Sequence, residues 1–389
     1  MQSDNKRFRT THAVIHTGDG VKNAREAARL IRGDLAAFPA SLVIYFSSAD
    51  YDADVLAREM QDAFPSALTM GCTTAGEAVD GLILNCSVVA MAFSAEVFDY
   101  CESALVTDGS AGATGRDVFG SVADAMDYIG RGAEGNWIDL DHRRHIGFML
   151  GDSISAFSER VLDQVGEMTD VLFIGGFSGD DLKFDGSQRV MYRGKAYRNA
   201  AVLSLWKPRN GFAILKTQAA ELNGPNMVIT RADEANRILW ELDGEDAAAA
   251  YARVIGRPQE TMNILDFDEH PLAFMVDGEP FLQAVLQQVD GKGLRMFASI
   301  RQGTRRTVTT AGDVLETTRR ALADKLRETG DISAILHINC SSRHTALKNR
   351  NQLEGFAALF GDVPSVAMSS YGEIYVGPIA ETSTMILFK

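Results

Sequence analysis

Blocks of apolar residues alternate with blocks of amphipathic sequence along the first part of the chain. Residues 42–46 are a continuous apolar run, which is typical of a strand buried on both faces. Residues 50–64 carry apolar residues at helical spacing, and Pro65 ends the predicted helix. A second apolar run at 67–71 leads directly into the turn sequence at 72–77. This order predicts a strand–helix–strand unit whose two strands pair in parallel.

The same unit occurs three times in the sequence. Each copy has an apolar strand, a helix, a second apolar strand and then a turn that contains glycine. The later copies place these elements at 146–150, 155–167 and 171–174, and at 334–338, 350–360 and 365–368. The first turn, CTTAGE at 72–77, aligns without a gap with MSSYGE at 368–373, and the middle turn is shorter and has Gly179-Asp180. Reuse of one unit predicts that the three turns lie at equivalent ends of the sheets.

Apolar runs typical of β-hairpins follow each turn, so we expect antiparallel strands beside the parallel pairs. The predicted fold class is therefore α/β (mixed α+β), with mixed sheets flanked by helices. At 389 residues the chain is also too long for a single core. Residues 209–331 have a different pattern, for which we expect a helix over 231–255 and a β-meander over 272–300. Together these features predict two domains, 10–220 and 221–389.

The turns carry the chemistry that binding of a small polar ligand requires. Gly76 and Gly372 can adopt positive φ without strain, and hydroxyl residues precede them at 73–74 and 369–370. The carboxyl ends of parallel strands are where open α/β sheets bind ligands. An acidic residue follows each glycine, and its carboxylate suits a ligand ammonium group or fixes the turn. A purely conformational role for these turns is the alternative.

These motifs resemble the FIST domain, a sensory module of bacterial and archaeal signalling proteins. The sequences VIYFSS at 43–48 and MGCTTAGE at 70–77 are similar to its opening, and GGFSGDD at 175–181 is similar to its second glycine turn. The stretch that contains Asn339-Cys340, Arg343 and SSYGE at 369–373 resembles the companion C-terminal FIST domain. The resemblance covers nearly the whole chain and assigns the two predicted domains to the N-terminal and C-terminal FIST domains.

The resemblance implies a bacterial, cytoplasmic sensor that is not an enzyme and that binds an amino acid or another small polar compound. It also implies an output through a histidine kinase or a cyclic-di-nucleotide enzyme, expected to be a separate protein because the chain ends at its final strand. The predicted ligand contacts are Ser47, Ser48, Cys72, Thr73, Thr74, Gly76, Glu77, Gly176, Ser178, Arg301, Cys340, Arg343, Ser369, Ser370, Tyr371 and Glu373.

A haem-binding sensor of nitric oxide is an alternative from the same family. Some free-standing members hold haem through a histidine, which is expected in the segment after the last Gly-Glu turn. In this sequence that segment is residues 374–382, and it contains no histidine. A haem ligand would therefore have to be another residue, and the cofactor is left open.

Composition and charge narrow the class of partner. The formal net charge of −14 opposes binding to nucleic acid phosphates and to anionic membrane surfaces. The N-terminus has no apolar segment typical of a secretion signal, and the four cysteines include no Cys-x-x-Cys pair. A cytoplasmic protein with reduced thiols and without a membrane or nucleic-acid partner is expected.

An enzymatic alternative depends on two candidate nucleophiles. Cys340 lies four residues before His344, and Ser153 ends a Gly-Asp-Ser sequence after a strand. A hydrolase or transferase would need a base that activates one of these side chains. Arg301, at the end of the apolar run 296–300, is a candidate contact for a ligand carboxylate, and an exposed surface position is the equal alternative.

Overall fold

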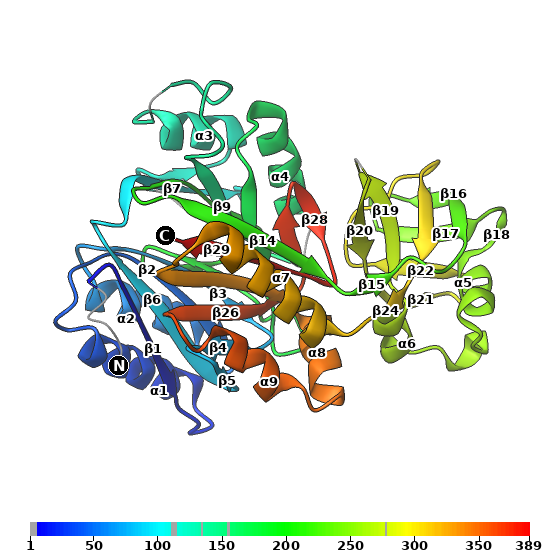
Figure 1. Ribbon diagram of the computed structural model, residues 1–389, viewed down its shortest axis with the longest axis horizontal. Coiled ribbons are helices and arrows are strands. Elements are labelled where there is room, and N and C mark those ends of the chain that lie inside the picture. The colour runs from blue at the N-terminus through cyan, green and yellow to red at the C-terminus, as the bar shows by residue number, and fades with distance from the viewer. Residues whose placement is uncertain (1–5, 110–114, 134, 154–155, 277) are drawn as a thin grey trace.

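The structure is a computed structural model that describes residues 6–109, 115–133, 135–153, 156–276 and 278–389. Figure 1 shows a large body, formed by the first half and the C-terminal part of the chain, and a smaller lobe at the right, formed by the residues between them. The body contains three mixed sheets, and the lobe has a sheet of its own. The predicted fold class is therefore confirmed.

The body is built from three units, each with three strands that alternate with helices, then a hairpin and a final strand. The first unit is β1 (Phe8–Val14), α1 (Gly20–Asp34), β2 (Ala40–Ser48), α2 (Ala53–Ala63), β3 (Leu68–Thr74), β4 (Glu77–Val79), β5 (Leu82–Leu84) and β6 (Ser87–Ser94). The second is β7 (Phe98–Thr107), β8 (Val118–Phe119), α3 (Val122–Gly130), β9 (Ile146–Gly151), α4 (Phe157–Met168), β10 (Phe173–Phe177), β11 (Val190–Tyr192), β12 (Lys195–Tyr197) and β13 (Ala200–Pro208). The third is β14 (Phe212–Gln218), α7 (Val314–Thr329), β25 (Ala334–Cys340), α8 (Ser341–Asn349), α9 (Leu353–Ala357), a 3-10 turn (Ala358–Phe360), β26 (Ser365–Ser370), β27 (Glu373–Tyr375), β28 (Gly377–Ile379) and β29 (Thr382–Phe388).

Each unit forms the centre of one sheet in the same strand order. The orders are β1-β6-β2-β3, β7-β13-β9-β10 and β14-β29-β25-β26. In each sheet the second and third strands of the unit pair in parallel, as the sequence predicts, and the final strand lies antiparallel beside them. The three turns therefore lie at equivalent sheet edges.

The hairpin of each unit leaves its own sheet and extends the sheet of another unit. Hairpin β4–β5 pairs with β26, hairpin β11–β12 pairs with β3, and hairpin β27–β28 pairs with β10. The first unit thus extends the third, the third extends the second, and the second extends the first. We call this closed cycle the hairpin exchange, and it locks the three units together.

The three sheets enclose one apolar core, and helices cover their outer faces (Figure 1). Ile44 and Phe46 of β2 point into this core, together with Trp206 of β13 and Phe388 of β29. Tyr45, between them in the sequence, packs outward against the helices of the first unit. Burial on both faces explains why 42–46 is a continuous apolar run rather than an alternating one.

The lobe is an insertion in the third unit, between β14 and α7. It comprises β15 (Ala220–Glu221), β16 (Asn226–Asp233), β17 (Ile238–Leu242), β18 (Glu245–Asp246), α5 (Ala247–Ile255), a 3-10 turn (Gln259–Thr261), α6 (Ile264–Glu269), β19 (Leu272–Val276), β20 (Glu279–Gln283), β21 (Val285–Val289), β22 (Gly293–Met296), β23 (Arg305–Val308) and β24 (Thr310–Ala311). It has its own apolar core, and the pairing of β15 with β24 closes the neck where the chain enters and leaves it. The residues that follow the lobe return to the body, and the predicted boundary at 220/221 stays a prediction.

The helix expected over 231–255 is wrong in its first part. Strands β16 and β17 occupy most of 226–242, and the helix begins only at Ala247. Arg237 and Asp243 have positive φ, which is typical of tight turns between antiparallel strands. These turns fold residues 226–242 into antiparallel strands, although the apolar residues in this segment are also spaced as in a helix. The β-meander expected over 272–300 corresponds to the antiparallel pairs β19–β20 and β21–β22.

Candidate ligand-binding site

The three glycine turns meet at the centre of the body. They are joined in pairs by backbone hydrogen bonds, so that each turn contacts the other two. These bonds are Ala75 N to Ser369 O (2.8 Å), Ser369 N to Gly76 O (2.7 Å), Phe177 N to Gly372 O (2.9 Å), Tyr371 N to Phe177 O (3.2 Å), Gly179 N to Thr73 O (2.8 Å) and Asp181 N to Thr74 O (3.0 Å). The sequence placed the turns at equivalent sheet edges, and the hairpin exchange brings those edges together.

Glycine is required at the outer turns because of their backbone conformation. Gly76 has φ of 146° and Gly372 has φ of 150°, which L side chains rarely adopt. A Cβ atom at Gly372 would also lie 3.0 Å from the ring of Phe177 in the neighbouring turn. The glycines therefore fix how closely the three turns can approach one another.

The hydroxyl and acidic residues of two turns bind each other inside the protein. Glu77 accepts hydrogen bonds from Thr74 (2.5 Å) and from Ser87 at the start of β6 (2.6 Å). Glu373 accepts equivalent bonds from Ser370 (2.6 Å) and from the amide of Thr382 (3.1 Å). Burial raises the pKa of Glu77 to about 7 and that of Glu373 to about 8, against the opposing effect of these hydrogen bonds. These predicted ligand contacts are thus engaged with the protein itself, and a ligand role for them stays a prediction.

In the middle turn the acidic residue organises a loop instead. The carboxylate of Asp180 accepts hydrogen bonds from the amides of Phe184 (3.0 Å), Asp185 (3.1 Å) and Gly186 (3.3 Å) and from the hydroxyl of Tyr371. Within residues 181–184, three non-glycine residues have positive φ. Such a backbone persists only where its surroundings hold it, and it is common at binding sites. We call residues 180–186 the Asp180 loop.

The Asp180 loop carries an aromatic side chain into solvent at the junction of body and lobe. Phe184 is 53% exposed and stacks on Tyr371 with ring centroids 5.0 Å apart. The ring centroid of Phe297, in the lobe, lies 6.4 Å from that of Phe184. The aromatic group therefore has one member from each of the second unit, the third unit and the lobe.

A cleft of about 620 Å³, open to solvent, lies beside this aromatic group at the junction of body and lobe. Its polar lining includes Ser153 and Gln188 from the body and Arg237 and Arg295 from the lobe. Among the described residues, Arg295 Nε and Gln188 Oε1 are buried without a hydrogen-bond partner. Buried donors and acceptors without partners are rare in proteins, so these two atoms are where a ligand would gain most. Arg295 could not be predicted from the sequence, because the pattern of residues does not tell which lobe strand faces the body.

Arg237 connects the lobe to the body beside this cleft. Its guanidinium donates to the carbonyl of Phe297 (2.9 Å) and lies 3.2 Å from the carboxylate of Glu159 on α4. Glu159 also accepts a hydrogen bond from Ser299 of the lobe. One edge of the cleft is therefore formed by polar contacts that join the lobe to the body.

A second, mainly apolar cavity lies beside the first and third turns. Glu77 and Ser369 form part of its wall, with Phe356 and Phe360 opposite, and His337 and His344 also line it. Burial lowers the pKa of His337 to about 3 and that of His344 to about 4, so both imidazoles are neutral near pH 7. Neutral imidazole is the form that binds metals, and the walls of the cavity are apolar. The cavity holds only about 30 Å³, however, so a porphyrin would fit only after these side chains moved apart.

The geometry around Cys340 differs from that of an activated nucleophile. Its thiol is buried and accepts a hydrogen bond from the amide of Glu381 (3.3 Å), while His344 is hydrogen-bonded to Ser369 (3.3 Å). Burial, with the nearby Glu373 and Glu381, raises the pKa of the thiol. A reactive cysteine needs the opposite shift. Ser153, the other candidate, accepts a hydrogen bond from Gln188 (3.3 Å) and lines the cleft.

Arg343 is a buried cation that holds the third unit together. It is 1% exposed and donates hydrogen bonds to Asn339 (3.2 Å), Thr217 (3.2 Å) and Thr318 (2.8 Å). Burial lowers its pKa to about 10, so it remains charged at neutral pH. Its partners are neutral oxygens of three different elements, which indicates a structural role for this predicted ligand contact.

The remaining predicted contacts are divided between the turns and other places. Five lie at or beside the joined turns in buried positions: Ser47, Ser48, Cys72, Gly176 and Ser178. Ser48 donates to Asp181 (2.9 Å), whereas the hydroxyls of Ser47 and Ser178 have no partner among the described residues. Arg301 is exposed on the lobe and is not among the residues that line the cleft. Burial raises the pKa of Asp163 on α4, and the charge of Arg301 partly opposes this shift.

Comparison with known protein families finds two adjoining domain matches in the chain. The model of the FIST N domain matches residues 41–245, and the model of the FIST C domain matches residues 247–376. The chain therefore belongs to the FIST family, whose domains are sensory, ligand-binding modules of signal transduction. No helix in the described ranges combines the length and apolar character that crossing a membrane requires.

Individual relatives add little to this assignment. The chain is similar to the uncharacterized protein MJ1623 of Methanocaldococcus jannaschii, with 24% identity over 226 residues that cover 54% of this chain and 43% of that protein. The match thus spans less than half of the relative's length. Two solved structures cover 98% of this chain and 73% of their own: PurLQS from Thermotoga maritima (TM-score 0.20, 9% identity) and T. maritima PurL complexed with FGAR (TM-score 0.18, 10% identity). Similarity this low carries no argument about the chain.

Proposed function

We propose that this protein is a cytoplasmic sensor of a small carboxylate-bearing molecule, such as an amino acid, and that the ligand binds in the cleft between body and lobe. The proposal rests on Arg295, which lines this cleft and whose buried Nε has no hydrogen-bond partner among the described residues. A guanidinium is the side chain that matches a carboxylate best, because it donates two parallel hydrogen bonds. The nearby amide oxygen of Gln188 suits an ammonium or hydroxyl group of the same ligand.

The walls of the cleft support a ligand that also has an apolar part. Phe184, Tyr371 and Phe297 supply aromatic surface beside the polar groups. Binding sites for small molecules commonly combine such apolar surface with a few polar groups that fix orientation. Because Phe184 belongs to the Asp180 loop, a ligand in the cleft would contact the element that touches all three turns.

A signal would arise from the position of the lobe. The lobe is joined to the body by the neck at β15 and β24, and the pair Arg237–Glu159 spans the junction. A ligand that contacts both sides favours one lobe position only by its greater affinity for that position. We propose that a separate histidine kinase or cyclic-di-nucleotide enzyme reads this position, which can be tested by kinase or cyclase assays with and without ligand.

Replacing Arg295 with methionine is expected to weaken ligand binding by about tenfold or more, because hydrogen bonds to charged groups contribute roughly 1.5–3 kcal/mol. A thermal-shift screen of amino acids and small carboxylates identifies the ligand, and calorimetry measures its affinity for both proteins. Methionine retains much of the aliphatic stem, so the free protein should keep its stability.

Arg301→Met is the matched control, because Arg301 lies on the same lobe but outside the cleft. It should leave affinity unchanged. If Arg301→Met abolished binding and Arg295→Met did not, the ligand would contact the arginine predicted from the sequence, and the cleft would be the wrong site. A screen without any stabilising compound at millimolar concentration would also contradict the proposal.

Haem sensing is a second candidate function, in which the two neutral histidines would be the iron ligands and the apolar cavity would have to widen around the porphyrin. In that case His344 or His337 would hold the iron, and the bound haem would supply the gas-binding position. Protein incubated with haem should then show a Soret band that shifts with nitric oxide. His344→Ala or His337→Ala should remove the band, whereas replacement of the exposed His142 should not. Absence of a band in the unmodified protein would exclude this candidate.

A further inference from the structure

Three loops of the first unit converge at one end of its sheet. Strands β1 and β2 run in the same direction with β6 antiparallel between them. The ends of β1 and β2 therefore lie beside the start of β6. His16 follows β1 by two residues, Asp50 follows β2 by two residues, and Cys86 immediately precedes β6. Topology alone thus brings an imidazole, a carboxylate and a thiol to one place.

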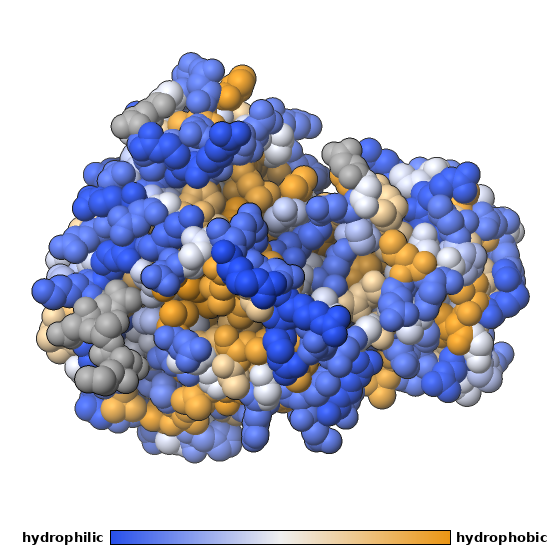
Figure 2. Space-filling view, in the orientation of Figure 1, coloured by the Kyte–Doolittle hydropathy of each residue, from blue (hydrophilic) through white to orange (hydrophobic). Residues whose placement is uncertain are grey.

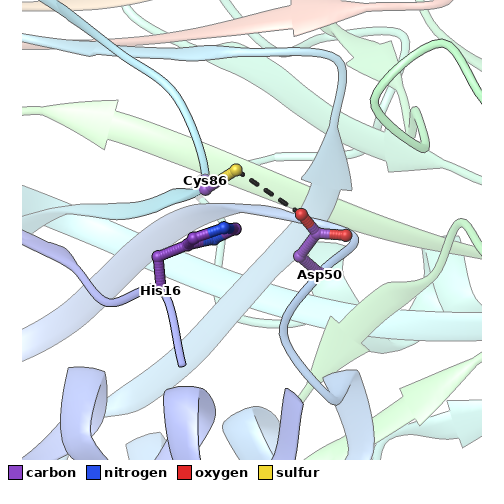
Figure 3. A group of neighbouring side chains, drawn as sticks. All are labelled: His16, Asp50 and Cys86. Carbon is purple, nitrogen blue, oxygen red and sulfur yellow. Dashed lines mark hydrogen bonds between the residues drawn. The ribbon is translucent and has the colours of Figure 1, made fainter. Parts of the chain in front are cut away.

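The three side chains point toward one another (Figure 3). One ligand atom from each, an imidazole nitrogen, a carboxylate oxygen and the sulfur, all lie within 4.8 Å of the others. The thiol of Cys86 donates to Asp50 Oδ2 at 3.4 Å. Ligands of a tetrahedral Zn²⁺ lie roughly 3.5 Å apart, given bond lengths of about 2.0–2.3 Å. Small side-chain rotations are therefore enough to surround an ion.

We propose that His16, Asp50 and Cys86 form a binding site for a divalent transition metal of the Zn²⁺ type. Mixed nitrogen, sulfur and oxygen donors suit Zn²⁺, whereas Mg²⁺ and Ca²⁺ prefer oxygen alone. Three protein ligands leave the fourth tetrahedral position to water or to an exogenous ligand. His16 and Asp50 are exposed and Cys86 is half-buried, so the site is accessible from solvent. This inference does not depend on the ligand proposed for the cleft.

A buried tyrosine holds the three loops in place. Tyr51, which follows Asp50, is 2% exposed. Its hydroxyl accepts a hydrogen bond from the amide of Ile15 (2.9 Å) and donates to the carbonyl of Cys86 (2.8 Å). One side chain thus fixes the backbone next to or at each of the three donors. Preorganisation of this kind reduces the entropy lost when a metal orders its ligands.

The residue directly before the final strand adopts the same unusual backbone conformation in all three units. Cys86 has φ of 47°, and the residues before β13 and β29, Asn199 and Glu381, have φ of 46° and 53°. In the second and third units the backbone amide of this residue donates a hydrogen bond at the end of a neighbouring strand. Asn199 N donates to Asp152, directly after β9 (2.6 Å), and Glu381 N donates to Cys340, the last residue of β25 (3.3 Å). Only the first unit combines this position with a neighbouring histidine and carboxylate, among the residues that the structure describes.

Lys183 connects the site to the Asp180 loop. Its ammonium lies 2.6 Å from Asp50 Oδ1 and 3.5 Å from Asp181. The oxygen nearer to Cys86 is Oδ2, so a metal bound there would leave the contact with Lys183 in place. Hydrogen bonds to the second oxygen of a ligating carboxylate are a common way to orient it.

The test uses the full chain without a histidine tag. Titration with Zn²⁺ by calorimetry should show one ion per chain, and Co²⁺ substitution should give a sulfur-to-metal charge-transfer band in the absorption spectrum. Cys86→Ser should remove that band, and Cys86→Ser, His16→Gln and Asp50→Asn should each weaken Zn²⁺ binding by at least about tenfold. The three residues lie at the surface edge of the sheet, and circular dichroism checks that each variant is folded.

His12→Gln and Cys101→Ser are the matched controls. His12 is exposed on β1, four residues before His16, and Cys101 is a half-buried cysteine of the second unit. Both should bind Zn²⁺ like the unmodified protein. The proposal is overturned if the unmodified protein binds no stoichiometric Zn²⁺, or if it binds Zn²⁺ with an affinity that the Cys86, His16 and Asp50 variants all retain.

Discussion

Replacing Gly175 with alanine is expected to prevent the body from folding. Gly175 lies in β10, between β9 on one side and β27 on the other. An added Cβ atom would lie 1.8 Å from the carbonyl oxygen of Met149, which is backbone and cannot rotate away. Strand β10 cannot shift either, because β27 comes from the third unit and is held there by the hairpin exchange. Overpacking of a rigid core costs typically 1–3 kcal/mol, and contact with fixed backbone should exceed that range.

The measurement is the yield of folded protein and its urea unfolding midpoint. Gly166→Ala in α4 is the matched control, since a Cβ atom there meets nothing within 4 Å. That change should stabilise the protein by about 0.5–1 kcal/mol, because alanine favours a helix over glycine. If the Gly175→Ala protein folded with near-normal stability, β9 and β10 would be able to move apart, and the expected clash with Met149 would be wrong.

The second large effect is a loss of stability as the pH rises from about 6.5 to 8. Burial raises the pKa of Glu77 to about 7 and that of Glu373 to about 8, so the folded protein holds protons that the unfolded chain has released. Stability from such groups is complete at low pH and is lost as the pH rises toward the folded pKa. Below pH 6.5 the buried His337 and His344 act in the opposite direction, because burial lowers their pKa values. The two effects oppose each other between about pH 4.5 and 6.5, so a broad stability maximum near pH 5.5 is expected, with a net loss above pH 6.5.

Glu77→Gln isolates the contribution of one carboxyl group. A rise in pKa from 4.5 to about 7 corresponds to about 3 kcal/mol at 1.36 kcal/mol per unit. The stability difference between the variant and the unmodified protein should therefore increase in favour of the variant between pH 4.5 and 7 and then level off. Urea unfolding at several pH values measures it.

Glu96→Gln, at an exposed position, is the control and should give a flat difference. A flat difference for Glu77→Gln as well would mean that Glu77 is ionised in the folded protein. The hydroxyls of Thr74 and Ser87 would then outweigh the effect of burial on this group.

The sequence predicts the three units because their signals are local. Each parallel strand is an apolar run beside an amphipathic helix, as at 42–64, and this pattern is visible in a short window. The hairpin exchange is not local. Residues 77–79 pair with β26 rather than with a strand of their own sheet, and nothing in three residues specifies a partner so far along the chain. Tertiary packing decides such pairings.

The same distinction applies to the candidate site. The turns could be predicted because Thr74-Ala75-Gly76-Glu77 and Ser370-Tyr371-Gly372-Glu373 repeat one motif, and the structure brings them together. Their burial, and the pairing of each hydroxyl with its own carboxylate, depend on contacts between units. The sequence analysis selected Arg301 and not Arg295, which lies in lobe strand β22 and lines the cleft. Only the orientation of the lobe toward the body separates the two.

Because of the hairpin exchange, the sheets of the second and third units cannot be completed when those units' own strands are first available. The first sheet waits only for β11 and β12, but hairpin β4–β5 emerges early and its partner β26 follows much later in the chain. Strand β10 must likewise wait for β27. The nascent chain therefore carries unpaired strand edges until β26 and β27 have been synthesised, a state that favours aggregation and chaperone binding. The body should then close in one late step rather than unit by unit from the N-terminus.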